Sequence, residues 1–256
     1  MTARHGFGIA GIAGRMGRML IEEIAAAGAP LAGGIDNDGG VNDATLFADI
    51  AGLAASSEVV IDFTHASAVR PHARMLARAG TAWVLGTTGL SAEEEAEVAK
   101  AALTIPVVHA PNFSPGVNLV LALAERMAAA LPQATYDAEI VEMHHRQKVD
   151  APSGTAIGIG RAVARGRGIT LEDNMESGRT GHTGARKPGA IGFSAMRGGQ
   201  VVGEHTLLFA SADEHIALTH RAFDRRVFAA GAVRAALWVR GKPPGLYSMQ
   251  DVLGIG

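Results

Sequence analysis

The stretch FGIAGIAGRMGRMLIEEIAAAG, residues 7–28, determines the class of fold that we expect for this chain. Its first part, Phe7 to Ile12, is apolar and predicts a buried strand. Glycine-rich sequence follows, and apolar residues then recur at helical spacing from Arg15 to Ala27. Gly28 ends the predicted helix, because glycine readily adopts the left-handed conformation that closes helices. The stretch therefore predicts a strand, a tight turn and a helix.

Strands and helices are predicted to alternate through the first half of the chain. After a second strand that ends at Ile35, further strand candidates are Val59–Phe63, Trp83–Leu85 and Val107–His109. Ser91 and Glu94 have the capping-box spacing of a helix that continues through Lys100, and Glu93–Glu97 is expected to be its solvated face. This alternation predicts an α/β fold, a parallel sheet wound on both faces by helices.

The sequence changes character after Pro115, where we expect a second domain to begin. Its predicted elements are, in order, Val117–Leu131 (helix), Asp137–Met143 (strand), about Thr155–Ala164 (helix), Gln200–Ala210 and His215–Thr219 (strands). The glycine-, threonine- and valine-rich region 178–220 predicts a mostly antiparallel sheet. A last helix, Val227–Trp238, is expected to pack on the first domain. We thus expect residues 1–114 and 225–256 to form one domain and 115–224 the other.

Composition excludes several classes of function. The 256 residues carry a formal net charge of −2 and a sequence pI near 6.6, so neither nucleic acid nor a membrane is an expected partner. The chain has no cysteine, which excludes disulfides, thiolate catalysis and cysteine-ligated metals. We find no run of membrane-spanning length and no secretory signal, so a cytoplasmic location is expected.

Three glycines give the first indication of a cofactor. Gly11, Gly14 and Gly17 form GxxGxxG between the first strand and its helix. Asp36 lies 19 residues after Gly17, at the end of the second strand, where a carboxylate can hydrogen-bond the ribose of a dinucleotide. A merely tight turn between strand and helix is the alternative. In its context the motif predicts a Rossmann-type domain that binds a dinucleotide.

Two more loops follow strands at the same edge of the predicted sheet, where ligands of open α/β sheets bind. One is Gly86–Gly89 and the other Ala110–Phe113, although each taken alone is equally compatible with an ordinary turn. The expected cofactor contacts are Gly11, Ile12, Ala13, Gly14, Arg15, Met16, Gly17, Asp36, Asn37, Gly86, Thr87, Thr88, Ala110, Pro111, Asn112 and Phe113.

Residues 142–156, EMHHRQKVDAPSGTA, concentrate proton donors and anion-binding groups. His144, His145 and Lys148 bring potential cations together, and Ser153 to Thr155 offer hydroxyl and backbone N–H donors to a carboxylate. The segment predicts a site that binds and protonates an acid. A metal site and purely structural histidines are the alternatives, and we expect no metal. Most other histidines are expected to be structural: His65, His72, His109, His182, His205, His215 and His220.

Seven motifs in order resemble those of 4-hydroxy-tetrahydrodipicolinate reductase, also called dihydrodipicolinate reductase: IAGRMGR (12–18), IDFTH (61–65), GTTG (86–89), APNFSPGVN (110–118), HHRQKVDAPSGTA (144–156), GHTG (181–184) and VGEHT (202–206). The resemblance covers the whole chain. It implies an NAD(P)H-dependent oxidoreductase of diaminopimelate and lysine biosynthesis. It also implies an α+β substrate domain, 115–224, whose open mixed sheet assembles a homotetramer.

The resemblance assigns roles to individual residues. It implies that His144 is the acid/base residue and Lys148 the proton donor, and that the substrate is a small dicarboxylate. The implied substrate-binding residues are His145, Gly154 and Thr155, and we expect Ser153 and Thr88 to bind the substrate with them. One departure concerns the cofactor: Asn37 stands where members of the family often have a basic residue, which leaves the choice between NADH and NADPH open.

Two other classes of function are compatible with the first domain. A dehydrogenase or imine reductase for another amino acid, such as aspartate or diaminopimelate, would share the dinucleotide fold without requiring the HHRQK segment. A non-catalytic nucleotide sensor would not need His144 and Lys148. Turnover of the expected substrate distinguishes these classes.

Overall fold

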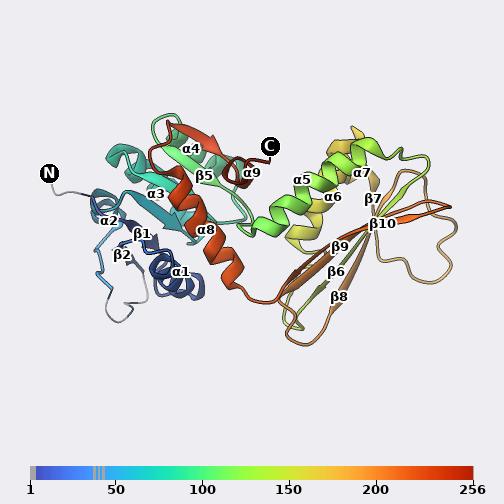
Figure 1. Ribbon diagram of the computed structural model, residues 1–256, viewed down its shortest axis with the longest axis horizontal. Coiled ribbons are helices and arrows are strands. Elements are labelled where there is room, and N and C mark those ends of the chain that lie inside the picture. Colours follow the sequence, from blue (N-terminus) through green and yellow to red (C-terminus); the bar gives the residue numbers. More distant parts are fainter. Residues whose placement is uncertain (1–3, 37–38, 40, 42–43, 256) are drawn as a thin grey trace. The chain divides into compact units, whose positions relative to one another are not determined.

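The structure is a computed structural model that describes residues 4–36, 39, 41 and 44–255 (Figure 1). The chain divides into two compact units. Unit 1 contains the residues up to Pro115 together with Arg226–Gly254, and unit 2 contains Gly116–Arg225. The chain therefore leaves unit 1 once and returns to it through the helix predicted near its end.

Unit 1 is built on a six-stranded sheet in the order β11-β5-β4-β3-β1-β2, and every neighbouring pair is parallel. Its strands are β1 (Phe7–Ala10), β2 (Leu31–Ile35), β3 (Val59–Asp62), β4 (Ala82–Leu85), β5 (Pro106–His109) and β11 (Gly245–Tyr247). Short apolar runs form these strands because both faces of the sheet are buried, as parallel sheets require.

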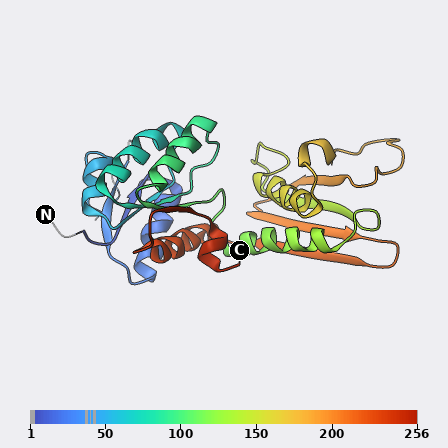
Figure 2. The same ribbon diagram turned by 90° about the horizontal axis from the view of Figure 1, so that it is seen from above.

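Helices cover both faces of this sheet and make two separate cores. On one face lie α1 (Arg15–Ala26), α8 (Arg226–Val239) and α9 (Met249–Leu253); on the other lie α2 (Ile50–Ser56), α3 (Ala66–Ala79) and α4 (Ala92–Ala102). Alternate strand residues serve the two cores: Ile61 belongs to the first and Val60 to the second. Figure 2 shows α8 in red on the opposite side of the sheet from α3 and α4. The predicted doubly wound fold is confirmed.

Unit 2 contains a five-stranded sheet in the order β10-β9-β6-β8-β7. Its strands are β6 (Asp137–His144), β7 (Met175–Ser177), β8 (Ile191–Arg197), β9 (Gly203–Ala210) and β10 (His215–Ala222). The β6–β9 and β9–β10 pairs are antiparallel, whereas β6–β8 and β7–β8 are parallel. The mostly antiparallel sheet expected from composition is therefore wrong, and the open mixed sheet is confirmed. Helical connections after β6 return the chain in the direction that parallel pairing requires.

The helices of unit 2 pack on one face of its sheet (Figure 1). They are α5 (Pro115–Ala130), α6 (Gly154–Arg167) and the short α7 (Leu171–Asn174). The burial of β6 alternates strictly along the strand, so Ala138, Ile140, Glu142 and His144 point toward the helix-covered side. This alternation places two ionisable groups at the end of an otherwise apolar row.

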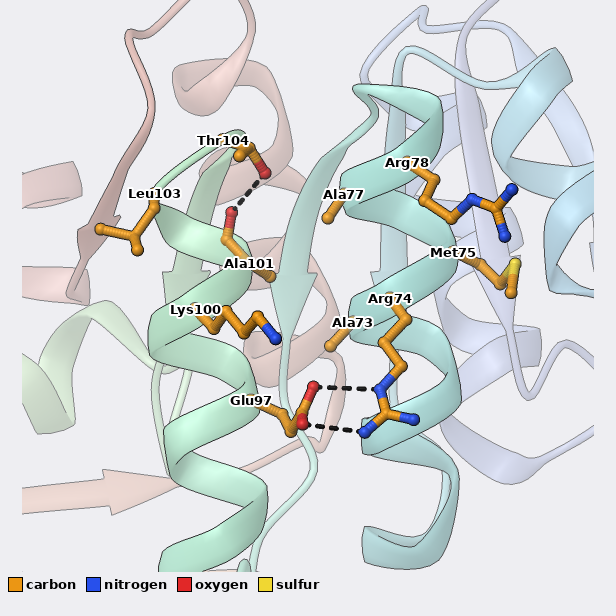
Figure 3. A pocket seen from close by; sticks show the side chains of 10 residues that line it. All are labelled: Ala73, Arg74, Met75, Ala77, Arg78, Glu97, Lys100, Ala101, Leu103 and Thr104. Carbon is orange, nitrogen blue, oxygen red and sulfur yellow. Dashed lines mark hydrogen bonds and ion pairs between the residues drawn. The ribbon is translucent and has the colours of Figure 1, made fainter.

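The predicted solvated face of α4 is exposed at Glu93 and Glu95, and it also carries ion pairs. The acidic run on α4 is not simply solvated, because Glu97 accepts hydrogen bonds from Arg74 Nε at 3.2 Å and Nη2 at 2.9 Å (Figure 3). Glu93 also lies 3.3 Å from an Arg70 nitrogen. These pairs join α3 to α4, and the predicted capping box at Ser91 and Glu94 is present at the helix start.

Candidate active site

The carboxyl ends of the unit 1 strands gather the loops that the sequence predicted to bind a cofactor. The order of the strands reverses between β1 and β3, the position at which open parallel sheets bind ligands. A cleft of about 560 Å³ lies there, lined among others by Gly11, Asp36 and Phe63–His65. A second hollow of about 410 Å³ shares Phe63–His65 and adds Gly86–Gly89.

The turn after β1 depends on its glycines. Gly11 has φ +85°, which side chains other than glycine rarely tolerate. A Cβ on Gly17 would lie 2.2 Å from the Gly11 carbonyl oxygen, so α1 can approach the turn this closely only without one. The Ala13 N–H donates to Asp36 Oδ2 at 2.8 Å, which fixes the carboxylate against the same turn.

The start of α1 is suited to an anion. Gly14 is its N-cap, and no side chain among the described residues caps the helix there. The first N–H groups of a helix have no partner within it, and the helix dipole adds positive charge at that end. Arg18 braces the turn by donating from Nε to the Ala13 carbonyl at 3.1 Å, while Arg15 is exposed. Backbone groups here match a pyrophosphate.

Asp62, at the end of β3, organises the loop between the two hollows and was given no role by the sequence analysis. Its carboxylate is fully buried and accepts hydrogen bonds from Thr64 N at 3.0 Å and Thr64 Oγ1 at 2.6 Å. His72 Nδ1 of α3 lies 2.7 Å from its other oxygen. The buried carboxylate thus ties the loop to the middle of α3.

The other predicted cofactor residues divide between surface and core. Thr88 and Pro111 are exposed, and Thr87 donates from Oγ1 to the Thr64 carbonyl at 3.1 Å. Phe113 is buried and packs edge-to-face on Phe63 with ring centroids 5.6 Å apart, so its side chain belongs to the core. Asn37 lies outside the described residues.

In unit 2 the buried row of β6 ends in a carboxylate–imidazole pair. His144 Nδ1 lies 2.5 Å from Glu142 Oε2, and both residues are buried. The short contact fixes the ring so that Nδ1 carries the hydrogen directed at Glu142. Nε2 is then the nitrogen that can exchange a proton with a ligand.

Glu142 is held from two further directions. Arg197 of β8 donates from Nη1 and Nη2 to its two oxygens, each at 2.9 Å, and Ser153 N donates to Oε1 at 3.2 Å. Burial alone would raise the pKa of Glu142, but the hydrogen bonds and charges of Arg197 and His144 lower it below its usual value. Glu142 is therefore an anion that orients its neighbours.

The pKa of His144 is lowered by burial, and the charges of Lys148 and Arg197 add to this effect. The hydrogen bond to Glu142 and its charge act in the opposite direction without cancelling it. Without a ligand, the imidazole is therefore mostly neutral at pH 7. A bound anion would reverse the balance, because it favours the imidazolium form.

Two further cations contact residues of the histidine segment. Lys148 Nζ donates to Asp150 Oδ1 at 2.7 Å, so the lysine ammonium is held by an exposed carboxylate two residues away. Arg225 Nη2 lies 3.3 Å from His145 Nε2. Arg146, by contrast, is exposed.

The start of α6 completes the cluster. Ser153 is the N-cap, and its Oγ accepts from Ala156 N at 3.2 Å. Gly154 is exposed, and no atom lies within 4 Å of the position of a Cβ on it. The helix start beside Glu142 and His144 thus offers N–H groups and space for a carboxylate.

Two family descriptions cover nearly the whole chain. Residues 6–113 match "Dihydrodipicolinate reductase, N-terminus", and residues 116–253 match "Dihydrodipicolinate reductase, C-terminus". The chain belongs to the dihydrodipicolinate reductase family. The 4-hydroxy-tetrahydrodipicolinate reductase of Granulibacter bethesdensis is 68% identical over 252 residues, 97% of this chain and 96% of that protein. The enzyme of the same name from Gluconacetobacter diazotrophicus is 64% identical over 248 residues, with the same two shares.

Solved structures agree with the fold of a dihydrodipicolinate reductase. The dipicolinate-bound dihydrodipicolinate reductase of Paenisporosarcina has a TM-score of 0.79 at 23% identity and covers 97% of this chain and 99% of its own. An aspartate dehydrogenase from Thermotoga maritima reaches only 0.52 at 9% identity, covering 94% and 99%. Both likenesses concern the fold alone.

Four residues in contact with the histidine segment were not assigned a function from the sequence: Asp150, Arg197, His205 and Arg225. Asp150 lies inside the quoted histidine segment, and His205 inside VGEHT, so their motifs were available as signals. Arg197 and Arg225 had no such signal, since their proximity depends on strand pairing and on the end of unit 2.

Two features are absent from the described residues, a membrane-spanning helix and a cluster of metal-ligating side chains. No helix there is both long and apolar enough to cross a membrane. Within the same part of the chain, no group of three or more histidine, aspartate or glutamate side chains has an arrangement that could hold a metal ion.

Proposed function

We propose that the cluster around Glu142 and His144 binds and protonates the substrate, and that the carboxyl edge of unit 1 holds the cofactor. The activity is that of a 4-hydroxy-tetrahydrodipicolinate reductase: NADH or NADPH reduces 4-hydroxy-tetrahydrodipicolinate to tetrahydrodipicolinate with loss of water, in lysine biosynthesis through diaminopimelate. The observation that carries the site assignment is the 2.5 Å contact between His144 and Glu142 beside the start of α6.

The residues of the carboxyl edge fit a dinucleotide. The uncapped start of α1 suits the pyrophosphate, and Asp36 suits the hydroxyls of the adenosine ribose. Thr87, Thr88 and Ala110–Asn112 are proposed to contact the nicotinamide half. When bound, the cofactor supplies the hydride of the reaction.

A dicarboxylate is the ligand that suits unit 2. We assign one carboxylate to the N–H groups of Gly154 and Thr155 and to the hydroxyls of Ser153 and Thr155, at the positive end of α6. Lys148 and Arg225 add positive charge, and Arg225 lies 3.3 Å from the proposed substrate-binding residue His145. Thr88, which belongs to unit 1, stays a proposed substrate-binding residue.

We assign the supply of protons to the substrate to His144 and Lys148. The reaction consumes one hydride and one proton and releases one water, and the departing hydroxyl must be protonated. Two negative charges on the substrate raise the pKa of His144, so that Nε2 gains the proton that it delivers. Positioned acid catalysis of this kind commonly contributes about 10²- to 10⁴-fold.

A homotetramer is the proposed assembly. The support is the face of the unit 2 sheet that no helix of its own unit covers. Met196 on this face is 48% exposed, and Val141 and Met143 are partly exposed beside it. A second copy of the sheet would bury this apolar row. Sedimentation of the purified protein measures the number of chains.

Turnover tests the proposed roles. We expect His144→Ala and Lys148→Ala each to lower kcat by more than about tenfold with enzymatically generated substrate, while NADH binding survives. Arg146→Ala is the matched control, since it removes an exposed cation from the same segment. Near-normal kcat in both test variants would remove the proposed proton donors. A parent protein that binds NADH without turnover would instead indicate a sensor.

A further inference from the structure

His205 of β9 has a place in the site that its isolation in the sequence did not suggest. The ring is 3% exposed and lies edge-on to His144, with centroids 5.1 Å apart. His205 Nε2 is 3.0 Å from Ser153 Oγ. Register explains this position, because His205 is the cross-strand partner of Glu142.

The direction of the bond between His205 and Ser153 decides what the serine can do. A hydroxyl has one hydrogen to donate and two lone pairs to accept with. Ser153 Oγ already accepts from Ala156 N as the cap of α6. If His205 Nε2 donates, the second lone pair is used and the hydroxyl hydrogen stays available. If Nε2 accepts, that hydrogen is consumed.

The other ring nitrogen indicates the direction. His205 Nδ1 is buried and has no hydrogen-bond partner among the described residues. Burial, followed by the charge of His144, lowers the pKa of His205 to about 4, so the ring is neutral at pH 7 with a single hydrogen. On Nδ1 that hydrogen would be an unpaired buried donor, which proteins tolerate less readily than an unpaired acceptor. On Nε2 it meets Ser153.

We propose that His205 is a positioning residue whose Nε2–H donates to Ser153 Oγ and thereby reserves the serine hydroxyl hydrogen for a carboxylate of the bound dicarboxylate. The serine is then held from three sides, since its own N–H donates to Glu142 Oε1 at 3.2 Å. This inference rests on the proposed function and makes the Ser153 hydroxyl solely a donor toward the ligand.

The tautomer of His205 tests the first half directly. The protein is labelled with nitrogen-15 histidine, and its spectrum without ligand is compared with that of His205→Gln to assign the ring. Nε2 is expected to carry the hydrogen and Nδ1 to lack it. A hydrogen on Nδ1, or a charged ring at pH 7, overturns the proposal. The outcome does not depend on any substrate.

A double-mutant cycle tests the second half. The probe is pyridine-2,6-dicarboxylate, with its Kd measured by calorimetry. His205→Phe preserves a planar ring and removes the donor, so we expect about five- to tenfold weaker binding. In the Ser153→Ala background the same change should cost less than about twofold. His205→Gln should recover most of the loss, because its amide N–H can donate to Ser153.

The experiments distinguish failure of the proposed role of His205 from failure of the proposed substrate site. Equal losses from His205→Phe in both backgrounds overturn the proposal, since His205 would then act by a route other than Ser153. Full affinity in His205→Phe with an unchanged melting temperature overturns it as well. If the parent protein does not bind the dicarboxylate but His205 shows the Nε2–H tautomer, the proposed substrate site fails while the serine orientation stands.

Discussion

The two proposed ligand sites of this chain are built from different chemical groups. The carboxyl edge of unit 1 is largely backbone: Gly11 and Gly17 create the turn, and the start of α1 carries no side-chain cap. The site in unit 2 is largely charged side chain, with Glu142 held by Arg197 and His144. A site made of backbone groups should lose its ligand when a side chain is added to one of its glycines. A site made of charged side chains should lose its activity when one charge is removed. The two kinds of substitution therefore test the comparison.

The largest effect is expected from Gly17→Ala in unit 1. Its Cβ would lie 2.2 Å from the Gly11 oxygen and 2.4 Å from the Ile12 oxygen, so the turn must open. Overpacking of this kind costs about 1 to 3 kcal/mol of stability, and the turn no longer fits a pyrophosphate. We expect NADH affinity, measured by fluorescence titration, to fall by more than about 100-fold.

Gly158→Ala in α6 is the control for this change, because the nearest atom to its Cβ would be 3.5 Å away. It should bind NADH normally. Normal NADH affinity in Gly17→Ala would mean that the turn after β1 does not hold the cofactor.

In unit 2 the corresponding change is Glu142→Gln, which removes a charge and preserves shape. Arg197 loses its buried partner, which typically costs about 3 kcal/mol, and His144 loses the anion that stabilises its protonated form. We expect kcat to fall by about 100-fold in the steady-state assay, with NADH affinity unchanged.

Glu139→Gln is the matched control, since Glu139 lies on the same strand, faces the other side and is also paired with an arginine. It should lower the melting temperature without lowering kcat. If both variants lose kcat equally, Glu142 supports only the strand and not the chemistry.

The same contrast explains what could be predicted from sequence. A parallel strand, a glycine turn and a helix are local patterns, so β1, α1 and the doubly wound sheet followed from residues 7–28 and the later alternation. β11 was missed because three residues, Gly245–Tyr247, are too few to show a period. β8 was missed because apolar and polar residues do not alternate regularly along it, as they would in a strand with one buried and one exposed face.

The unit 2 site was predictable only where the chain is contiguous. Residues 142–156 carry Glu142, His144, Lys148 and Ser153 on one segment. Arg197 and His205 reach the cluster through strand register, being paired in the sheet with His144 and Glu142. The motif VGEHT contains His205, but register depends on the whole sheet, and hence no local pattern could place either residue beside Glu142 and His144.

We expect the choice between NADH and NADPH to depend on the residues that follow β2 in the sequence. Asp36 would repel the 2′-phosphate of NADPH, and Asn37, the next residue in the sequence, adds no positive charge. We expect the parent to use both cofactors with NADH equal or preferred. Asn37→Arg should raise kcat/KM for NADPH relative to NADH by up to about 10- to 100-fold.

Arg18→Ala is the control, since Arg18 is already bonded to the Ala13 carbonyl and should leave the cofactor ratio unchanged. A parent with strong preference for NADPH, or an Asn37→Arg variant with an unaltered ratio, would place recognition of the phosphate elsewhere. Exposed Arg15 at the start of α1 is then the first candidate.

The smallest expected effect is a difference in pH dependence: the affinity for a dicarboxylate should change with pH, whereas the affinity for NADH should not. Without ligand the pKa of His144 lies below its usual value, chiefly through burial, and two bound carboxylates raise it. Between the two pKa values, binding of pyridine-2,6-dicarboxylate must take up a proton. Its affinity should therefore fall as pH rises through that window, by at most about tenfold per unit, and level off above it.

Calorimetry in buffers of different ionisation enthalpy measures the proton uptake directly, over about pH 5.5 to 8. His144→Asn should abolish the part of the slope that belongs to the imidazole, because its amide cannot titrate. NADH affinity should show no such slope in either protein, since the turn at Gly11–Gly17 presents backbone groups to its ligand. A dicarboxylate affinity that is equally pH-dependent in His144→Asn would assign the proton to a group other than His144. It would leave Glu142 as an anchor for Arg197 rather than a partner in proton transfer.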